Sequence, residues 1–100
     1  MKLVINDDFG GFGISDGARE VLGLGKYDRV DRTNPLLVKM VEKDAEATRG
    51  AYSSLCVVEI PDEATDYMIN EYDGAETVYY VLNGKIYEAF EPENEDEEED

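Results

Sequence analysis

The chain opens with short apolar runs that glycines separate. The run at residues 2–6 predicts a strand, and the glycines within residues 10–13 predict a tight loop after it. Ser15 can cap a helix by accepting a hydrogen bond from a backbone N–H, and apolar residues recur on one helical face after it. We therefore expect a short helix that begins after Ser15 and ends by residues 23–25.

A stronger helix signal lies in the middle of the chain. Asn34 is a good N-cap, and Pro35 fits the first helical position, where no backbone N–H is needed. The apolar residues that follow form a stripe suited to packing on a sheet: Leu36, Leu37, Met40 and Val41. This pattern predicts a helix that runs to about residue 46 and is ended by Thr48-Arg49-Gly50.

From residue 55 onward the pattern becomes that of strands. Residues 55–60 are apolar and rich in β-branched side chains, and Pro61-Asp62 ends this run. Residues 65–72 predict a second strand, which the turn residues Asp73-Gly74 close. Most of the predicted sheet therefore comes from the second half of the chain.

The clearest local pattern is a hairpin formed by residues 77–82 and 85–90. Asn83-Gly84 lies between these strand-like runs and favours a two-residue type I′ turn, because both central positions need a positive φ. The turn pairs Tyr80 with Tyr87 on one face and Tyr79 with Glu88 on the other. We expect one face to be covered and the other to carry exposed aromatic side chains.

The order of these elements predicts an α+β fold. With 100 residues the chain has room for one core, so residues 1–90 are expected to form a single domain. The predicted architecture is one mostly antiparallel sheet of four or five strands, with two helices packed on one face and a C-terminal β-hairpin. Residues 91–100 are predicted to be a disordered acidic tail, because they hold eight carboxylates and no apolar side chain to bury.

The charge is strongly acidic and unevenly placed. The chain has 25 Asp or Glu against 9 Lys or Arg, and Lys85 is the one base after residue 50. Direct binding to nucleic acid is disfavoured, because contacts to phosphates need clustered Lys and Arg. Two interpretations of the tail stay open: a solubilising segment, or a polyanion directed at a basic partner.

Composition excludes most familiar catalytic sites. The chain has no His and one cysteine, Cys56, which lies in an apolar run and is expected to be a buried, reduced thiol. We therefore predict a protein that is not an enzyme and has no catalytic residue, metal or cofactor. We also expect no membrane segment and a cytoplasmic location, since no apolar run is long enough to span a bilayer and the first residues are acidic.

Several short motifs occur in the same order as in a known group of proteins. They are Met1-Lys2 with Val4-Ile5-Asn6, Gly10-Gly11-Phe12-Gly13 with Ser15, Arg32-Thr33-Asn34-Pro35, Val57-Val58-Glu59-Ile60-Pro61-Asp62 and Glu71-Tyr72-Asp73-Gly74. With these motifs, about residues 1–76 resemble a group of small uncharacterised proteins of tailed bacteriophages and prophages. That group usually continues with a short, basic, Trp-containing ending, which the hairpin and acidic tail replace here. The resemblance implies a phage context and no assigned chemistry.

Two candidate sites follow from the residues. Carboxylates on a rigid sheet can reproduce the spacing of phosphates, and tyrosines supply contact area at low entropy cost. The predicted partner-binding residues are Glu71, Tyr72, Asp73, Glu76, Tyr79 and Glu88. The alternative is a small-ligand or nucleotide site in the glycine loop at residues 7–15, made by Gly10, Gly11, Gly13 and Ser15. The loop also has a structural interpretation, in which it turns Phe9 and Phe12 into the core.

The expected function is that of a phage or prophage protein that binds and inhibits a host macromolecule. Its partner is expected to be a host protein with a basic surface, such as a nucleic-acid-handling enzyme or a defence complex. Acidic mimicry of nucleic acid is one way for it to act. The runner-up is binding of a small ligand or nucleotide by the glycine loop. The sequence leaves the host target and the oligomeric state open.

Overall fold

The computed structural model describes residues 1–91. The predicted acidic tail therefore lies, apart from Glu91, outside the described residues. The elements in chain order are β1 (Lys2–Asn6), α1 (Asp16–Leu22), α2 (Pro35–Thr48), β2 (Leu55–Glu59), β3 (Asp66–Tyr72), β4 (Ala75–Leu82) and β5 (Lys85–Ala89). The predicted α+β class, the two helices and the C-terminal strand pair are confirmed. Within residues 1–91, neither helix is long and apolar enough for a membrane crossing.

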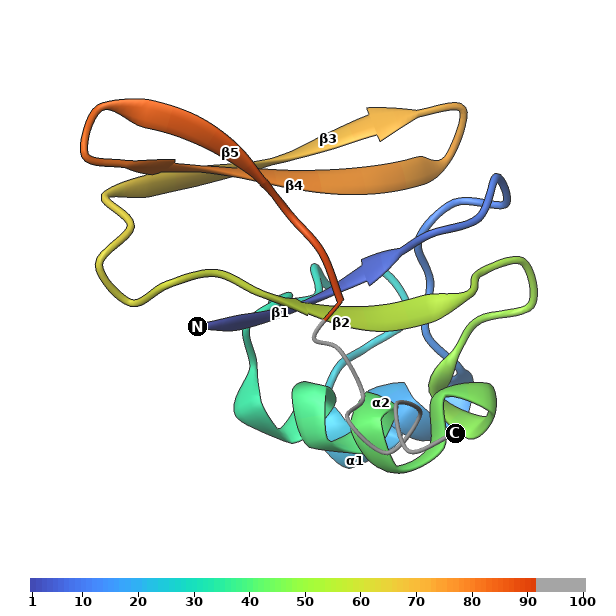
Figure 1. Ribbon diagram of the computed structural model, residues 1–100. Helices are drawn as coiled ribbons and strands as arrows, with labels where there is room; N and C mark the ends of the chain where they lie inside the picture. The colour runs from blue at the N-terminus through green and yellow to red at the C-terminus, as the bar shows by residue number, and fades with distance from the viewer. Residues whose placement is uncertain (92–100) are drawn as a thin grey trace, which may run out of the picture.

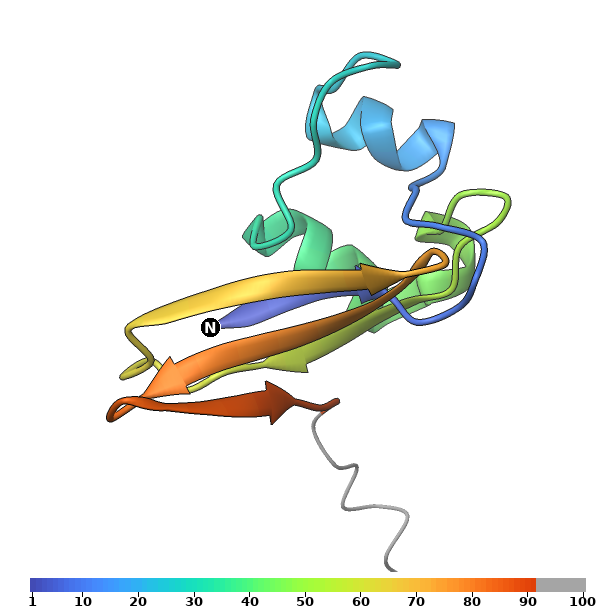
Figure 2. The same cartoon turned by 90° about the horizontal axis from the view of Figure 1, so that it is seen from above.

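The strands form two antiparallel sheets, so the prediction of one sheet is wrong. One sheet has the order β1-β2, and the other has the order β3-β4-β5. The ribbon of β1 and β2 lies between the helices and the three-stranded sheet, which gives three layers (Figure 1). Figure 2 views the molecule from the side of the three-stranded sheet, whose strands cross over the ribbon. The physical reason is that β1 and β2 are apolar on both faces and must be covered twice.

Each face of the ribbon has its own core. Val4, Leu55 and Val57 face the helices and pack with residues such as Leu37. The alternate residues of the ribbon face the three-stranded sheet, in a second cluster of buried residues: Leu3, Ile5, Cys56, Val58, Ile60, Val78 and Ala89. The continuous apolar runs of β1 and β2 are thus divided by strand alternation between two cores.

The helix ends follow the predicted capping residues. The Ser15 hydroxyl oxygen accepts from the Ala18 N–H at the start of α1, and Gly23 ends that helix with φ 74°. Asn34 Oδ1 accepts from the Leu36 N–H at the start of α2. Helix α2 ends two residues later than predicted, and its helical path is interrupted at Asp44. Capping therefore fixes where the helices begin, as the sequence predicts.

Gly17 in α1 gives a direct test of this helix. A Cβ at this position meets nothing within 4 Å, and the residue does not have a positive φ. We expect Gly17→Ala to raise the free energy of unfolding by about 0.5–1 kcal/mol, because alanine loses less backbone entropy than glycine in a helix. Thermal or urea unfolding measures the change. A loss of stability would contradict the helical assignment of this segment.

The C-terminal hairpin has the predicted turn. Asn83 and Gly84 have φ values of 54° and 79°, as a type I′ turn requires. The Tyr80 and Tyr87 rings stack with their centroids 5.5 Å apart. Strand register also follows the prediction and places Tyr79 opposite Glu88. The local sequence was therefore sufficient to predict this part of the fold.

Candidate functional site

The three-stranded sheet has one covered face and one open face. Val78 and Ala89 are buried against the β1–β2 ribbon and define the inner face. Because side chains alternate along a strand, the pairing register assigns the other residues to an outer face. The outer face consists of Asp66, Met68, Asn70, Tyr72, Ala75, Thr77, Tyr79, Val81, Ile86 and Glu88. Each of these ten residues is exposed or half-buried.

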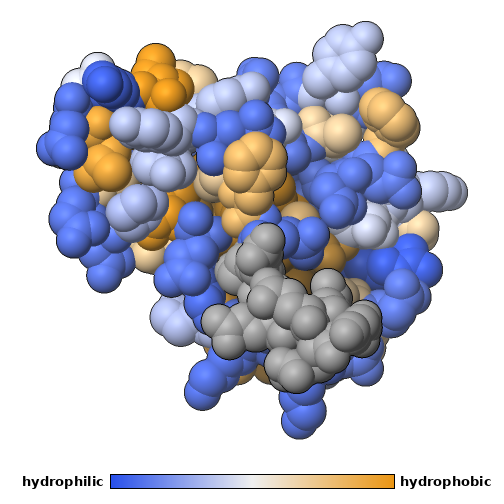
Figure 3. All heavy atoms as spheres, in the orientation of Figure 1, coloured by the Kyte–Doolittle hydropathy of each residue, from blue (hydrophilic) through white to orange (hydrophobic). Residues whose placement is uncertain are grey.

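The outer face exposes large apolar side chains. Met68, Tyr72 and Ile86 are 61%, 78% and 71% exposed. Met68 is paired with Tyr79, and Ile86 is paired with Val81, so these side chains are neighbours on adjacent strands. Figure 3 shows hydrophobic residues gathered at the upper left, over the end of the sheet where β4 turns into β5. A contiguous apolar patch of this kind is typical of an interaction surface.

A small cavity lies at this end of the outer face. Its volume is about 110 Å³. It is lined by Asp66, Tyr67, Met68, Tyr79, Tyr80, Val81 and Ile86. Pockets for drug-sized ligands have roughly 300–1,000 Å³, so this cavity is too small for one. Its size instead suits one side chain of a docked protein.

The charge of the outer face is negative. Asp66 on β3 and Glu88 on β5 are both exposed on it, and Asp73 lies in the turn at the end of β3. Lys85 is paired with Leu82 and therefore projects on the inner side of the sheet. The apolar patch is thus accompanied by carboxylates and by no base from β3, β4 or β5 on the same face.

The structure divides the predicted partner-binding residues into two groups. Tyr72, Tyr79 and Glu88 lie on the outer face, and Asp73 lies in the β3–β4 turn beside it. Glu71 and Glu76 are opposite each other on the inner face. They therefore do not share a surface with the other four residues. The turn residues Asp73-Gly74 set this register, so the sequence contained the information that assigns Glu71 and Glu76 to the other face.

Glu76 belongs to a partly buried ion pair with Arg32. The Arg32 Nη1 and Nη2 atoms donate to Glu76 Oε1 and Oε2 over 2.8 and 2.9 Å. The side chains are 22% and 8% exposed, and the guanidinium carbon lies 3.5 Å from the centre of the Phe12 ring. The Asn6 backbone N–H also donates to Glu76 Oε1. Glu76 thus ties β4 to β1 and to the segment before α2.

Asn6 connects three loops at one end of the molecule. Its side chain is buried, and Nδ2 donates to the carbonyl oxygens of Asp8 and Gly74. Its Oδ1 accepts from the Ser54 N–H over 2.7 Å. One amide therefore joins the glycine loop, the loop before β2 and the β3–β4 turn. Sequence reasoning missed this role because these partners are far apart in the chain.

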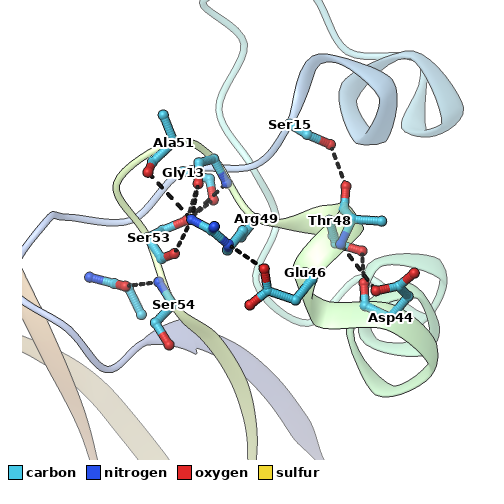
Figure 4. Close-up of polar contacts among 12 residues, drawn as sticks. Gly13, Ser15, Asp44, Glu46, Thr48, Arg49, Ala51, Ser53 and Ser54 are labelled. Atoms are coloured by element: carbon cyan, nitrogen blue, oxygen red, sulfur yellow. Dashed lines mark hydrogen bonds and ion pairs between the residues drawn. The ribbon is translucent and has the colours of Figure 1, made fainter.

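The glycine loop is held by packing and by internal hydrogen bonds (Figure 4). Gly13 accepts at its carbonyl oxygen from the Gly50 N–H and from the Ser53 hydroxyl. The Ser15 hydroxyl donates to the Ala47 carbonyl oxygen. A Cβ at Gly10 would overlap the carbonyl oxygen of Tyr52. These contacts support a structural role for three of the four predicted ligand-binding residues.

The remaining residues of this loop give a mixed result. Gly11 has φ 90° and open space where a Cβ would lie. Phe12 packs against the helix-side core, as expected. Phe9 is exposed, so the expectation that it turns into the core is wrong. The reason is that Gly74 packs against the Phe9 backbone and directs this loop over the end of the sheet.

A larger open cleft lies beside Phe12. Its volume is about 500 Å³, which is large enough for a small ligand. Its lining contains three arginines and three carboxylates: Arg19, Arg29, Arg32, Asp28, Glu71 and Glu76. Arg32 is paired with Glu76, and Arg19 donates to two backbone carbonyls. Within the described part of the chain, its walls do not include the four predicted ligand-binding residues.

Cys56 is a buried thiol, as expected. Burial and the nearby negative charge of Asp7 raise its pKa to about 12. Possible ligand atoms of Asp7, Cys56 and Glu91 lie within 4.8 Å of one another. A thiol with this pKa stays protonated near neutral pH and is therefore a poor nucleophile.

The raised pKa of Cys56 predicts a loss of stability in alkali. Between its ordinary value of 9.0 and about 12 the folded protein binds more protons than the unfolded chain. Stability should therefore fall with rising pH in this window, by up to ~1.4 kcal/mol per pH unit. Urea unfolding of the wild type and of Cys56→Ala across this range measures the difference in slope. Equal slopes would show that this thiol does not contribute.

Comparison with known proteins gave no match. No protein-family model, curated protein or solved structure matches the chain. Inferences about function therefore rest on the residues of the chain itself.

Proposed function

We propose that this is a non-enzymatic binding protein that docks on a basic surface of a host protein and inhibits it. The observation that carries the proposal is the outer face of the three-stranded sheet, where exposed apolar side chains lie among carboxylates. The phage or prophage context of the proposal comes from the resemblance of the sequence motifs. A nucleic-acid-handling enzyme or a defence complex in the host cytoplasm has the required basic surface.

The side chains of the outer face favour a protein as the partner. Tyr and Met are enriched in protein interfaces, and the energy of binding concentrates where such residues meet a pocket. Tyr72, Tyr79 and Met68 provide these contacts. The cavity beside Met68 gives a partner side chain a place to insert. This arrangement supports docking through an apolar centre with an acidic surround.

Mimicry of nucleic acid has less support than docking. A mimic needs a row of exposed carboxylates, whereas Glu71 and Glu76 project on the inner face and Glu76 is engaged by Arg32. Asp66, Asp73 and Glu88 remain on or beside the outer face. These three carboxylates, together with the net charge of −16, suit electrostatic steering toward a basic partner.

The proposal predicts selective and salt-sensitive capture from a bacterial lysate. The immobilised protein should retain a host protein at low salt and release it as salt rises, because steering charges are screened. Ile86→Lys should abolish retention, since it places a positive charge on the exposed apolar patch of the outer face. Mass spectrometry of the eluates measures the capture.

Tyr27→Lys is the matched control for this experiment. Tyr27 is exposed in the segment after α1, on the helical side of the molecule, so the substitution adds the same charge away from the outer face. It should retain the host protein as the wild type does. Docking through the outer face would be contradicted if Ile86→Lys still captured the host protein. It would also be contradicted if both variants lost capture to the same extent.

A further inference from the structure

We propose that the cavity on the outer face receives one basic side chain, arginine or lysine, of the partner protein. This inference rests on the proposed function, and it names the chemistry that the docking surface recognises. The cavity is the point where the exposed apolar patch and an exposed carboxylate meet. A basic side chain has both an apolar stem and a charged head, and it can satisfy both features at once.

The walls of the cavity fit the stem of such a side chain. Met68, Val81 and Ile86 contribute apolar surface, and the volume of about 110 Å³ is that of one long side chain. Tyr67 and Tyr80, which strand alternation assigns to the inner face, also line the cavity. Burial of the methylene groups against these walls removes apolar area from water and so favours binding.

The charged head has partners at the margin of the cavity. Asp66 lines it, and Asp66 Oδ1 accepts from the Tyr67 N–H over 2.8 Å, which orients the carboxylate. Glu88 is paired with Tyr79 on the same face. An arginine or lysine above the Tyr79 ring would gain cation–π attraction in addition to these charge contacts. The outer face therefore offers a cation two kinds of contact, with carboxylates and with an aromatic ring.

Charge also decides between a basic partner and a second copy of this chain. Two copies with a net charge of −16 repel each other. Lys85 is the one base of the strands that form the sheet, and it projects on the inner side. A self-complementary pairing of outer faces would bring Asp66 and Glu88 toward like charges. A positively charged partner removes this repulsion.

Two small probes that differ only in charge can test the inference. N-acetyl-arginine methylamide carries the guanidinium, and N-acetyl-citrulline methylamide has nearly the same shape without the charge. Both are titrated into the full-length, ¹⁵N-labelled protein and followed by the amide signals of Asp66, Met68, Tyr79, Val81 and Ile86. The arginine probe should shift these signals, and the citrulline probe should bind about threefold to tenfold more weakly.

Asp66→Asn tests the role of the carboxylate. Asparagine keeps an oxygen that can accept from the Tyr67 N–H, so the strand is preserved while the charge is removed. This variant should bind the arginine probe about twofold to fivefold more weakly. Asp16→Asn is the matched control, because Asp16 lies at the start of α1, on the far side of the ribbon. It should leave the affinity unchanged.

The outcomes separate this inference from the proposed function. Equal shifts by both probes would show an apolar anchor site, and they would overturn the preference for a basic side chain while leaving docking intact. A lack of shifts in the five signals with either probe would also overturn it. An unchanged affinity of Asp66→Asn for the arginine probe would show that the carboxylate does not take part in recognition. The proposed function fails separately, if Ile86→Lys still captures the host protein.

Discussion

Glu76→Ala should lower the free energy of unfolding by about 2–4 kcal/mol. The substitution leaves the guanidinium of Arg32 without its bidentate partner in a largely buried position, and the Asn6 N–H loses its acceptor. The pair joins segments that are 44 residues apart, so its loss affects the packing of β4 on the ribbon. Urea unfolding followed by circular dichroism measures the change.

Glu71→Ala is the matched control for the ion pair. Glu71 is the register partner of Glu76 on the same face, but it is exposed and accepts one hydrogen bond, from the Gly74 N–H. Its removal should cost about 0.5–1 kcal/mol. Similar losses for Glu71→Ala and Glu76→Ala would show that the bond to Arg32 does not stabilise the fold, contrary to expectation.

Gly74→Ala should destabilise the protein by about 2–4 kcal/mol for two physical reasons. Gly74 has φ 96°, a conformation that costs about 1–2 kcal/mol for a residue with a side chain. A Cβ at this position would also overlap the Phe9 carbonyl oxygen, so the loop after β1 would have to move. The same unfolding measurement gives the loss.

Gly84→Ala separates these two reasons. Gly84 has φ 79° in the β4–β5 turn, and a Cβ there meets nothing within 4 Å. It should therefore show the backbone cost alone, about 1 kcal/mol. If Gly84→Ala and Gly74→Ala cost the same, the close approach of the β3–β4 turn to the Phe9 loop does not add to the loss of stability in Gly74→Ala.

The local structure could be predicted from the sequence because its causes are local. Ser15 and Asn34 cap helices through bonds to residues two or three positions away. Asn83-Gly84 sets the turn of the last hairpin and, through it, the pairing of Tyr80 with Tyr87. Each of these features depends on a few neighbouring residues, so an isolated sequence is sufficient.

The division into two sheets depends on which faces are buried. Residues 3–5 and 55–58 are continuously apolar, a pattern typical of strands covered on both faces. We expected a sheet with helices on one face, and for such a sheet these runs would leave apolar residues exposed. The third layer resolves this by covering the second face of β1 and β2. The continuous apolar runs indicate that both faces of β1 and β2 are buried, but they do not indicate which strands cover the second face.

The candidate site was only partly predictable. Tyr72, Tyr79 and Glu88 share the outer face, as the alternation of side chains along the strands requires. The same alternation assigns Glu71 and Glu76 to the other face. The bond from Glu76 to Arg32 spans 44 residues, and that from Asn6 to Gly74 spans 68. No local pattern encodes such pairings, because they form only when the layers assemble.

Docking through the outer face is tested most directly by hydrogen–deuterium exchange on the free protein and on its complex with the captured host protein. The prediction is new protection in β3 and β5, over residues 66–72 and 85–89, because their edges and outer side chains would be covered. Residues 7–15 should exchange as they do in the free protein. Unchanged exchange in β3 and β5, with new protection confined to residues 7–15, would contradict docking through the outer face and favour the glycine loop.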